Sequence, residues 1–140
     1  MILTNMEYYR DEILDVTFIG EMHHSWPRHS HPQEFQIILV FDGKFEVDFP
    51  KCTVALTKDT FLVVPPQCVH AVRTITPAKI LFISIAKTAV DQDTVAVLDM
   101  LDKLVEVLQQ KGLIETKHLI LLSRAESQIL CAYRTQTDVC

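Results

Sequence analysis

Hydrophobic and polar positions follow two different periods along this chain, and the change falls near Lys87. Before it, short apolar runs rich in Val, Ile and Phe are separated by Gly, Pro and Asp, a pattern that predicts β-strands. These runs cover residues 13–19, 35–41, 45–49, 61–64 and 80–85. Because no helical segment lies between them to form crossovers, we expect a mainly β fold with an antiparallel barrel or sandwich.

The dipeptide Asp42-Gly43 separates two of the predicted strands. It tolerates the positive φ of a two-residue type I′ turn, so we predict that residues 35–41 and 44–49 form a hairpin. The second arm alternates apolar and polar positions, which indicates one buried face. The first arm is apolar on both faces apart from Gln36, which is typical of a central strand covered on both sides.

From residue 91 onward the apolar positions recur at helical spacing. One stripe of the first predicted helix contains Val97, Leu101, Leu104, Val105 and Leu108. Asp91 and Asp93 can cap its start, Gly112 can follow its last turn, and a second helix is expected after Thr116. The short link predicts an antiparallel helical hairpin, whose apolar stripe packs either on a sheet or on another subunit of a homodimer.

The length of 140 residues fits one structural domain. Within it we expect a β-barrel with an N-terminal arm in residues 1–88. The helical hairpin then occupies residues 89–140 and serves packing or dimerisation.

Charge and composition exclude several classes of function. Lys and Arg total 13 against 18 Asp and Glu, so we expect no nucleic acid contact by this segment. The chain has no apolar run near the roughly 20 residues of a membrane helix and no secretory signal, which predicts a cytoplasmic protein without membrane contact. The four cysteines lack C-x-x-C spacing and are expected to be free thiols. We find no sequence pattern that assigns a catalytic residue.

Three histidines are candidates for a shared site. His29 and His31 precede a predicted strand, and because alternate residues of extended backbone point to one side, they can present two imidazoles to one point. His70 follows another strand and can complete a facial set of three metal ligands with open positions. Glu34 is the oxygen candidate, although its strand parity is opposite and it joins the histidines only if Pro32 introduces a bend. Alternatively, the histidines are hydrogen-bonded side chains at a barrel mouth.

These residues resemble the two motifs of the cupins, G-x5-H-x-H-x3-4-E-x6-G and G-x5-P-x-G-x2-H-x3-N. The first motif is matched by His29, His31, Glu34 and Gly43, and the second by Pro65 and His70. The resemblance implies a cupin-like antiparallel β-barrel (a jelly roll, or double-stranded β-helix). It also implies a metal site of His29, His31, Glu34 and His70 for Zn, Ni, Fe or Mn.

The match to the cupin motifs departs at several positions. Asp59 and Gln67 stand where the second motif has glycines, and Glu34 comes one residue early. Gln36 is a second counterpart of the motif glutamate when one counts back from Gly43, and a neutral amide is a poor ligand for a hard metal ion.

Within the cupins, the chain is most similar to the N-terminal effector-binding and dimerisation domain of AraC-type transcription regulators. The similarity rests on His29-Ser30-His31 before an apolar strand, on Pro65-Pro66 four residues before His70, on Trp26 and on the predicted helix pair. It implies a sensor of a small-molecule effector, a sugar or small organic acid, and a homodimer. The implied ligand-binding residues are Trp26, His29, His31, Gln36 and His70.

Two further interpretations fit the same residues. One is a stand-alone metal-dependent cupin enzyme, an isomerase or oxygenase, with a three-His site and Glu34 or Gln36 as the fourth ligand. The other is a binding module without a transcriptional role. AraC-type regulators carry helix-turn-helix units after the hairpin, whereas this sequence stops at Cys140, so we expect either an excised fragment or a stand-alone protein of the same build.

Overall fold

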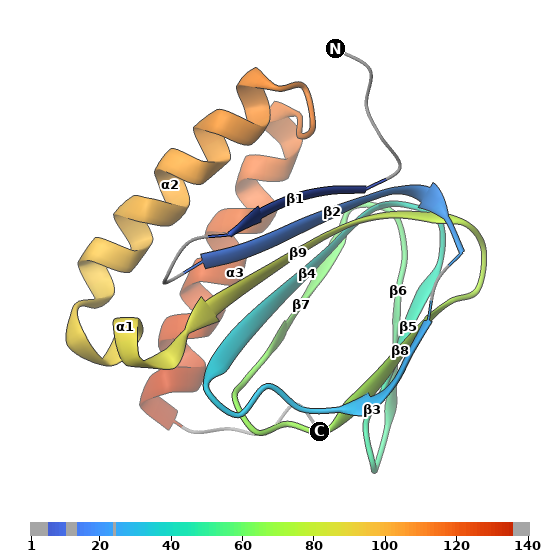
Figure 1. Ribbon diagram of the computed structural model, residues 1–140, viewed down its shortest axis with the longest axis horizontal. Helices are drawn as coiled ribbons and strands as arrows, with labels where there is room; N and C mark the ends of the chain where they lie inside the picture. The colour runs from blue at the N-terminus through green and yellow to red at the C-terminus, as the bar shows by residue number, and fades with distance from the viewer. Residues whose placement is uncertain (1–5, 11–13, 24, 136–140) are drawn as a thin grey trace.

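The computed structural model describes residues 6–10, 14–23 and 25–135, which form two antiparallel sheets and a layer of helices (Figure 1). In spatial order the five-stranded sheet contains β1 (Met6–Arg10), β2 (Leu14–Met22), β9 (Ala78–Ala86), β4 (Glu34–Asp42) and β7 (Thr60–Val64). The four-stranded sheet contains β3 (Ser25–His29), β8 (His70–Thr74), β5 (Phe45–Asp48) and β6 (Thr53–Leu56). The predicted mainly β, cupin-like fold is therefore confirmed.

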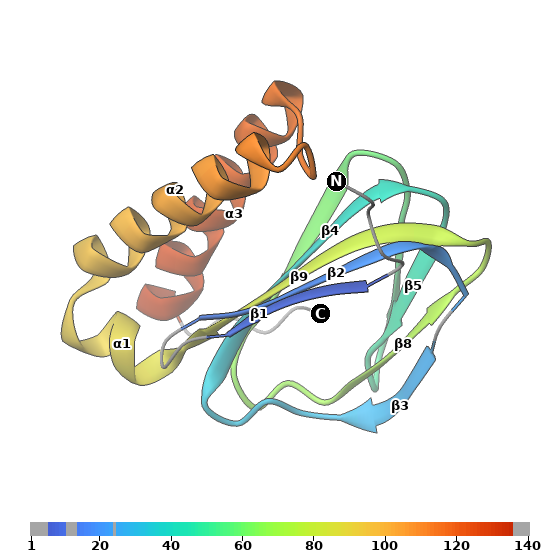
Figure 2. The ribbon, with the colours of Figure 1, turned by 45° about the horizontal axis from the view of Figure 1, so that its top comes forward.

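The described strands do not close into one barrel, which corrects part of that expectation. The two sheets face each other as separate hydrogen-bonded ladders, and the chain passes between them at short corners (Figure 2). One corner is the tight turn between β6 and β7, where the Thr60 N–H donates to the Thr57 carbonyl at 3.2 Å. Because such corners interrupt the ladders, the strands form a two-layer jelly roll.

The predicted hairpin at Asp42-Gly43 is wrong. β4 pairs with β7 and β9, whereas β5 pairs with β6 and β8, so the chain changes sheets at this turn. Gly43 does have a positive φ of 87°, and a Cβ atom at this position would lie 2.3 Å from the Pro77 carbonyl oxygen. The glycine is required by a corner packed against Pro77, and an Asp-Gly sequence alone does not distinguish that corner from a hairpin.

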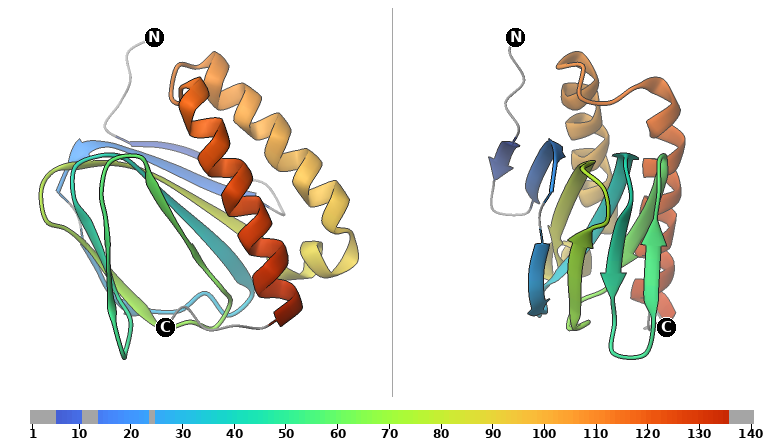
Figure 3. Two further views of the ribbon diagram at one scale, coloured as in Figure 1. Left: turned by 180° about the vertical axis from the view of Figure 1, so that it is seen from behind. Right: turned by 90° about the vertical axis from the view of Figure 1, so that its right-hand side faces the viewer.

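The two long helices agree with the predicted pattern, and a short helix that was not predicted precedes them. α1 (Lys87–Gln92) and α2 (Thr94–Gln110) follow β9 directly, and α3 (Thr116–Thr135) runs antiparallel to α2 (Figure 3). Asp93 caps α2 by accepting a hydrogen bond from the Ala96 N–H at 3.1 Å, and Gly112 has a φ of 74° after its last turn. None of the helices in the described part of the chain is long and apolar enough to cross a membrane.

Alternation along β4 and β9 divides the apolar residues into two cores. On β4, Phe35, Ile37 and Leu39 pack with the helices, whereas Ile38 and Val40 pack between the two sheets. All five residues of the predicted stripe on α2 are buried in the helix-side core. The helices therefore cover the outer face of the five-stranded sheet, which leaves the space between the sheets for a site.

Helix α3 is fixed to the sheet by a buried histidine. His118 is 4% exposed and its Nε2–H donates to the Asp59 carboxylate at 3.2 Å, while its Nδ1 accepts from the Glu115 N–H at 2.9 Å. The ring also lies 4.6 Å from the ring of Phe41. These contacts join the turn before β7 to the start of α3.

The cysteines differ from expectation at one position. Cys68 and Cys131 are thiols as predicted, but Cys52 is disulfide-bonded. The expectation of four free thiols is therefore wrong, because sequence spacing does not show which cysteines the fold brings together.

Asp59 and Gln67 both have positive φ, of 60° and 66°. These are the two positions where the second cupin motif has glycines, so the backbone keeps the left-handed turns although the glycines are missing. This conformation is less favourable by about 1 kcal/mol for a residue with a Cβ atom than for glycine.

We therefore expect the free energy of unfolding of Gln67→Gly to be about 1 kcal/mol higher than that of Gln67→Ala, because the exposed Gln67 side chain contributes little packing. Urea denaturation of both variants measures the difference. A Gly variant less stable than the Ala variant would contradict the assignment of a left-handed backbone here.

A pair of carboxyl groups links α2 and α3. Asp102 and Glu126 share a hydrogen bond, and burial together with the Asp102 charge raises the pKa of Glu126 to about 7. Between pH 4.5 and 7, folded Glu126 holds a proton that the unfolded chain has released, so the free energy of unfolding falls as the pH rises through this window.

Glu126→Gln removes this titration and is expected to stabilise the protein by about 1 kcal/mol at pH 8, after allowance for partial exposure of the pair. At pH 4.5 the variant and the original protein should be equally stable. Urea denaturation across this pH range is the measurement, with the exposed Glu106→Gln as the control for loss of one charge. Equal pH dependence in Glu126→Gln and in the original protein would show that the pKa of Glu126 is not raised.

Candidate metal centre and adjoining cavity

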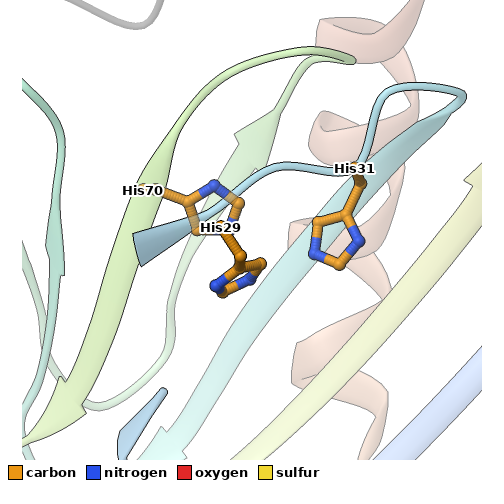
Figure 4. Close-up of side chains that lie close together, drawn as sticks. All are labelled: His29, His31 and His70. Atoms are coloured by element: carbon orange, nitrogen blue, oxygen red, sulfur yellow. The ribbon is translucent and has the colours of Figure 1, made fainter. Parts of the chain in front are cut away.

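Three imidazoles converge on the inner side of the four-stranded sheet. His29 ends β3, His31 follows two residues later, and His70 begins β8 (Figure 4). The ring of His29 lies 4.9 Å from that of His31 and 4.4 Å from that of His70, and the rings of His31 and His70 are 5.6 Å apart. One ligand nitrogen from each ring lies within 4.8 Å of the others, so one metal ion could contact all three.

Strand pairing places these side chains. In the antiparallel ladder of β3 and β8, His29 lies directly opposite His70, after an irregularity in register that follows Trp26. His31 lies beyond the end of β3, where its carbonyl accepts hydrogen bonds from the N–H groups of Glu34 at 3.4 Å and Gln67 at 3.2 Å. The left-handed turn at Gln67 therefore helps to hold His31 beside the other two histidines.

Backbone carbonyls orient two of the imidazoles. The Nδ1–H of His29 donates to the Pro27 carbonyl at 2.7 Å, and the Nδ1–H of His70 donates to the Cys68 carbonyl at 2.9 Å. Because a carbonyl only accepts, each ring carries its proton on Nδ1 and a lone pair on Nε2. This arrangement is usual for histidines that bind metals through Nε2.

Two of the ring nitrogens are buried without a partner. Nε2 of His31 and Nε2 of His70 are shielded from solvent and have no hydrogen-bond partner among the described residues. Buried polar atoms are nearly always satisfied, so two such atoms in one cluster indicate a missing bonding partner. A metal ion held by the three rings would supply it, and the residues present therefore fit a metal.

Two of the three histidines, His31 and His70, have lowered pKa values. Burial is the main cause that lowers the pKa of His31 and His70 below the ordinary value, and the neighbouring His29 lowers both further. Protonation of either ring would remove a lone pair, so the lowered pKa values favour the form of His31 and His70 that can bind a metal.

Gln36, rather than Glu34, lies at the site. The described residues that could share a metal are the three histidines, and Glu34 is not among them. Gln36 is 9% exposed and lines the same cavity as His29 and His31. Gln36 has the same strand parity as Glu34, and this parity does not keep it from the histidines, because the chain turns at residues 32–33 and enters the other sheet, where the alternation starts anew.

A cavity of about 430 Å³ adjoins the histidines between the two sheets. Three of the polar residues along its wall form a row across neighbouring strands, since Ser84 of β9 lies opposite Asp15 of β2 on one side and Gln36 of β4 on the other. An apolar wall faces the cavity as well, and the lining consists of Asp15, Thr17, Trp26, Pro27, His29, His31, Gln36, Val72, Phe82 and Ser84.

The cavity contains most of the predicted ligand-binding residues and some that the sequence analysis missed. Trp26, His29, His31 and Gln36 line it, whereas His70 is fully buried beside them. Asp15, Thr17 and Ser84 were missed. Their signal in the sequence is a polar residue inside an otherwise apolar strand, which is informative only once the strand's neighbours are known.

Comparisons with known proteins agree with this geometry. Residues 19–84 match the family model described as a cupin domain. A cupin-2 domain containing protein from Shewanella frigidimarina is similar, with a TM-score of 0.51 and 15% identity over 57% of this chain and 78% of that one. The cupin domain of Cnp3 from Schizosaccharomyces pombe has a TM-score of 0.53 and 14% identity over 66% of this chain and 68% of that one.

A third similar structure is KdgF from Halomonas sp., with a TM-score of 0.50 and 18% identity over 59% of this chain and 76% of that one. None of the curated protein sequences compared with the chain matches it. At these identities the structural likeness shows the fold alone. The family match covers residues 19–84, and the solved structures share the fold of this chain.

Proposed function

We propose that this protein is a metal-dependent cupin that binds a small organic molecule between its two sheets. One observation carries the proposal: the Nε2 atoms of His31 and His70 are buried without a partner among the described residues, in a cluster whose third member is His29. His29, His31 and His70 would hold a divalent transition metal ion, with Zn, Ni, Fe and Mn as the candidates for a three-nitrogen site.

A bound metal would supply positive charge and open coordination positions for a small-molecule ligand. The chain's own residues have the complementary tasks. The carbonyls of Pro27 and Cys68 hold two of the rings in the metal-binding orientation, and the cavity beside the rings has the size of a site for a small ligand. We propose a sugar or a small organic acid as the ligand class.

A second candidate function is effector sensing and dimerisation in an AraC-like transcription regulator. It is favoured by the helical hairpin that follows the cupin domain and by the exposed apolar residues Val95, Val107 and Ile120 on it. In that function ligand binding shifts the arrangement of the helices, and a homodimer forms through them. The alternative function, an isomerase or oxygenase, uses the same site for catalysis. Sedimentation at micromolar concentration tests the regulator function, because it separates a dimer from a monomer.

The metal proposal predicts stoichiometric binding that depends on the cluster. Chelator-treated protein without a His-tag should bind one Zn²⁺ per chain, and His31→Ala should weaken binding at least a hundredfold because one of three ligands is lost. Isothermal titration and metal analysis measure both. His31 is only partly buried, so the variant should still fold, which circular dichroism checks.

The matched control is His23→Ala. His23 is an exposed histidine outside the cluster, whose Nδ1 lies 3.0 Å from the Thr74 hydroxyl. Its removal should leave the Zn²⁺ affinity unchanged. Equal loss in both variants, or a folded protein that binds no metal, would rule out the proposed centre.

A further inference from the structure

We infer that the metal-loaded site selects a small organic carboxylate with an apolar body, and that the neutral side chain of Gln36 is the determinant of this selection. The inference rests on the proposed metal site and names the ligand class for it. Its basis is the absence of a carboxylate from the described residues that could share the metal, together with the chemistry of the cavity walls.

The side chains of the three histidines and of Gln36 carry no negative charge. Three neutral imidazoles and a neutral amide at Gln36 do not offset the charge of a divalent cation. A net charge in a partly dehydrated cavity is costly, and an anionic ligand that fills the open coordination positions lowers that cost. A glutamate at position 36 would supply this negative charge from the protein itself, and the site would then have less need for an anion.

Asp15 is the carboxylate among the lining residues, and its negative charge lowers the preference for an anionic ligand. It stands on β2, two strands from Gln36 in the polar row, and it lies outside the group whose nitrogens share one point. Glu34 is a second carboxylate outside this group, and its charge acts on His31 more strongly than that of Asp15. Both carboxylates reduce the preference for an anion, but neither is among the residues that could share the metal.

The cavity walls complement a carboxylate that has an apolar body. The hydroxyls of Thr17 and Ser84 and the amide of Gln36 can donate hydrogen bonds to carboxylate oxygens. Beside them on the same sheet, Phe82 packs edge-on against Trp26 of the other sheet with ring centres 5.6 Å apart, and Trp26 is still 41% exposed. The open part of this aromatic wall offers contact area to an aliphatic or aromatic group.

Cobalt(II) and phenylacetate are the probes that test the inference. Protein loaded with one equivalent of cobalt(II) is titrated with phenylacetate and, separately, with the neutral isostere phenylacetamide. The visible spectrum of the cobalt reports coordination, and calorimetry reports affinity. We expect phenylacetate to change the cobalt spectrum and to bind at least tenfold more tightly than phenylacetamide.

Two substitutions at one position separate charge from shape. Gln36→Glu adds a negative charge, whereas Gln36→Met keeps the length of the side chain without one. The Met variant should bind phenylacetate at least tenfold more tightly than the Glu variant. Asp15→Asn should increase the affinity for phenylacetate, because it removes the negative charge of Asp15. Equal phenylacetate affinity in the Glu and Met variants would overturn the role of Gln36.

The outcomes distinguish the inference from the function on which it rests. If cobalt binds to the three histidines but phenylacetate and phenylacetamide bind equally, the ligand class is wrong and the metal site stands. If His31→Ala and the original protein bind cobalt equally, the metal site itself is refuted, and the ligand class is refuted with it.

Discussion

The site depends on the register between β3 and β8. That antiparallel pair sets His29 opposite His70, and a slip by one residue would turn one of the two rings away from the other. The same pair leads into the segment that carries His31, whose carbonyl is held by the N–H groups of Glu34 and Gln67. A short edge ladder thus positions three imidazoles, and their cost is two buried nitrogens that none of the described residues satisfies.

The cavity exists because the helices pack elsewhere. β4 and β9 are apolar on both faces, so one face can be covered by α2 and α3 while the other faces the second sheet. At one end the inner face is closed by residues such as Ile38 and Val40. At the other end it carries the polar row of Asp15, Ser84 and Gln36. The change from apolar to polar along the inner face marks where packing ends and the cavity begins.

Local chemistry predicted the helices and the long strands from the sequence, since caps and periodicity depend on neighbours in the chain. The pairing of strands was harder to predict from the sequence. Asp42-Gly43 predicts a turn, but only the position of Pro77 shows that the turn crosses between sheets. The histidine cluster was predicted from spacing and family resemblance. The partners Asp15, Thr17 and Ser84 were not, because their common wall is formed by strands far apart in sequence.

The central claim is that three imidazoles bind one ion, and X-ray absorption fine structure of the zinc-loaded protein tests it most directly. The account predicts imidazole scattering from three histidines with nitrogens at about 2.0–2.1 Å, and light-atom scatterers at the remaining positions. Fewer than two imidazoles, or a sulfur shell at about 2.3 Å, would contradict it.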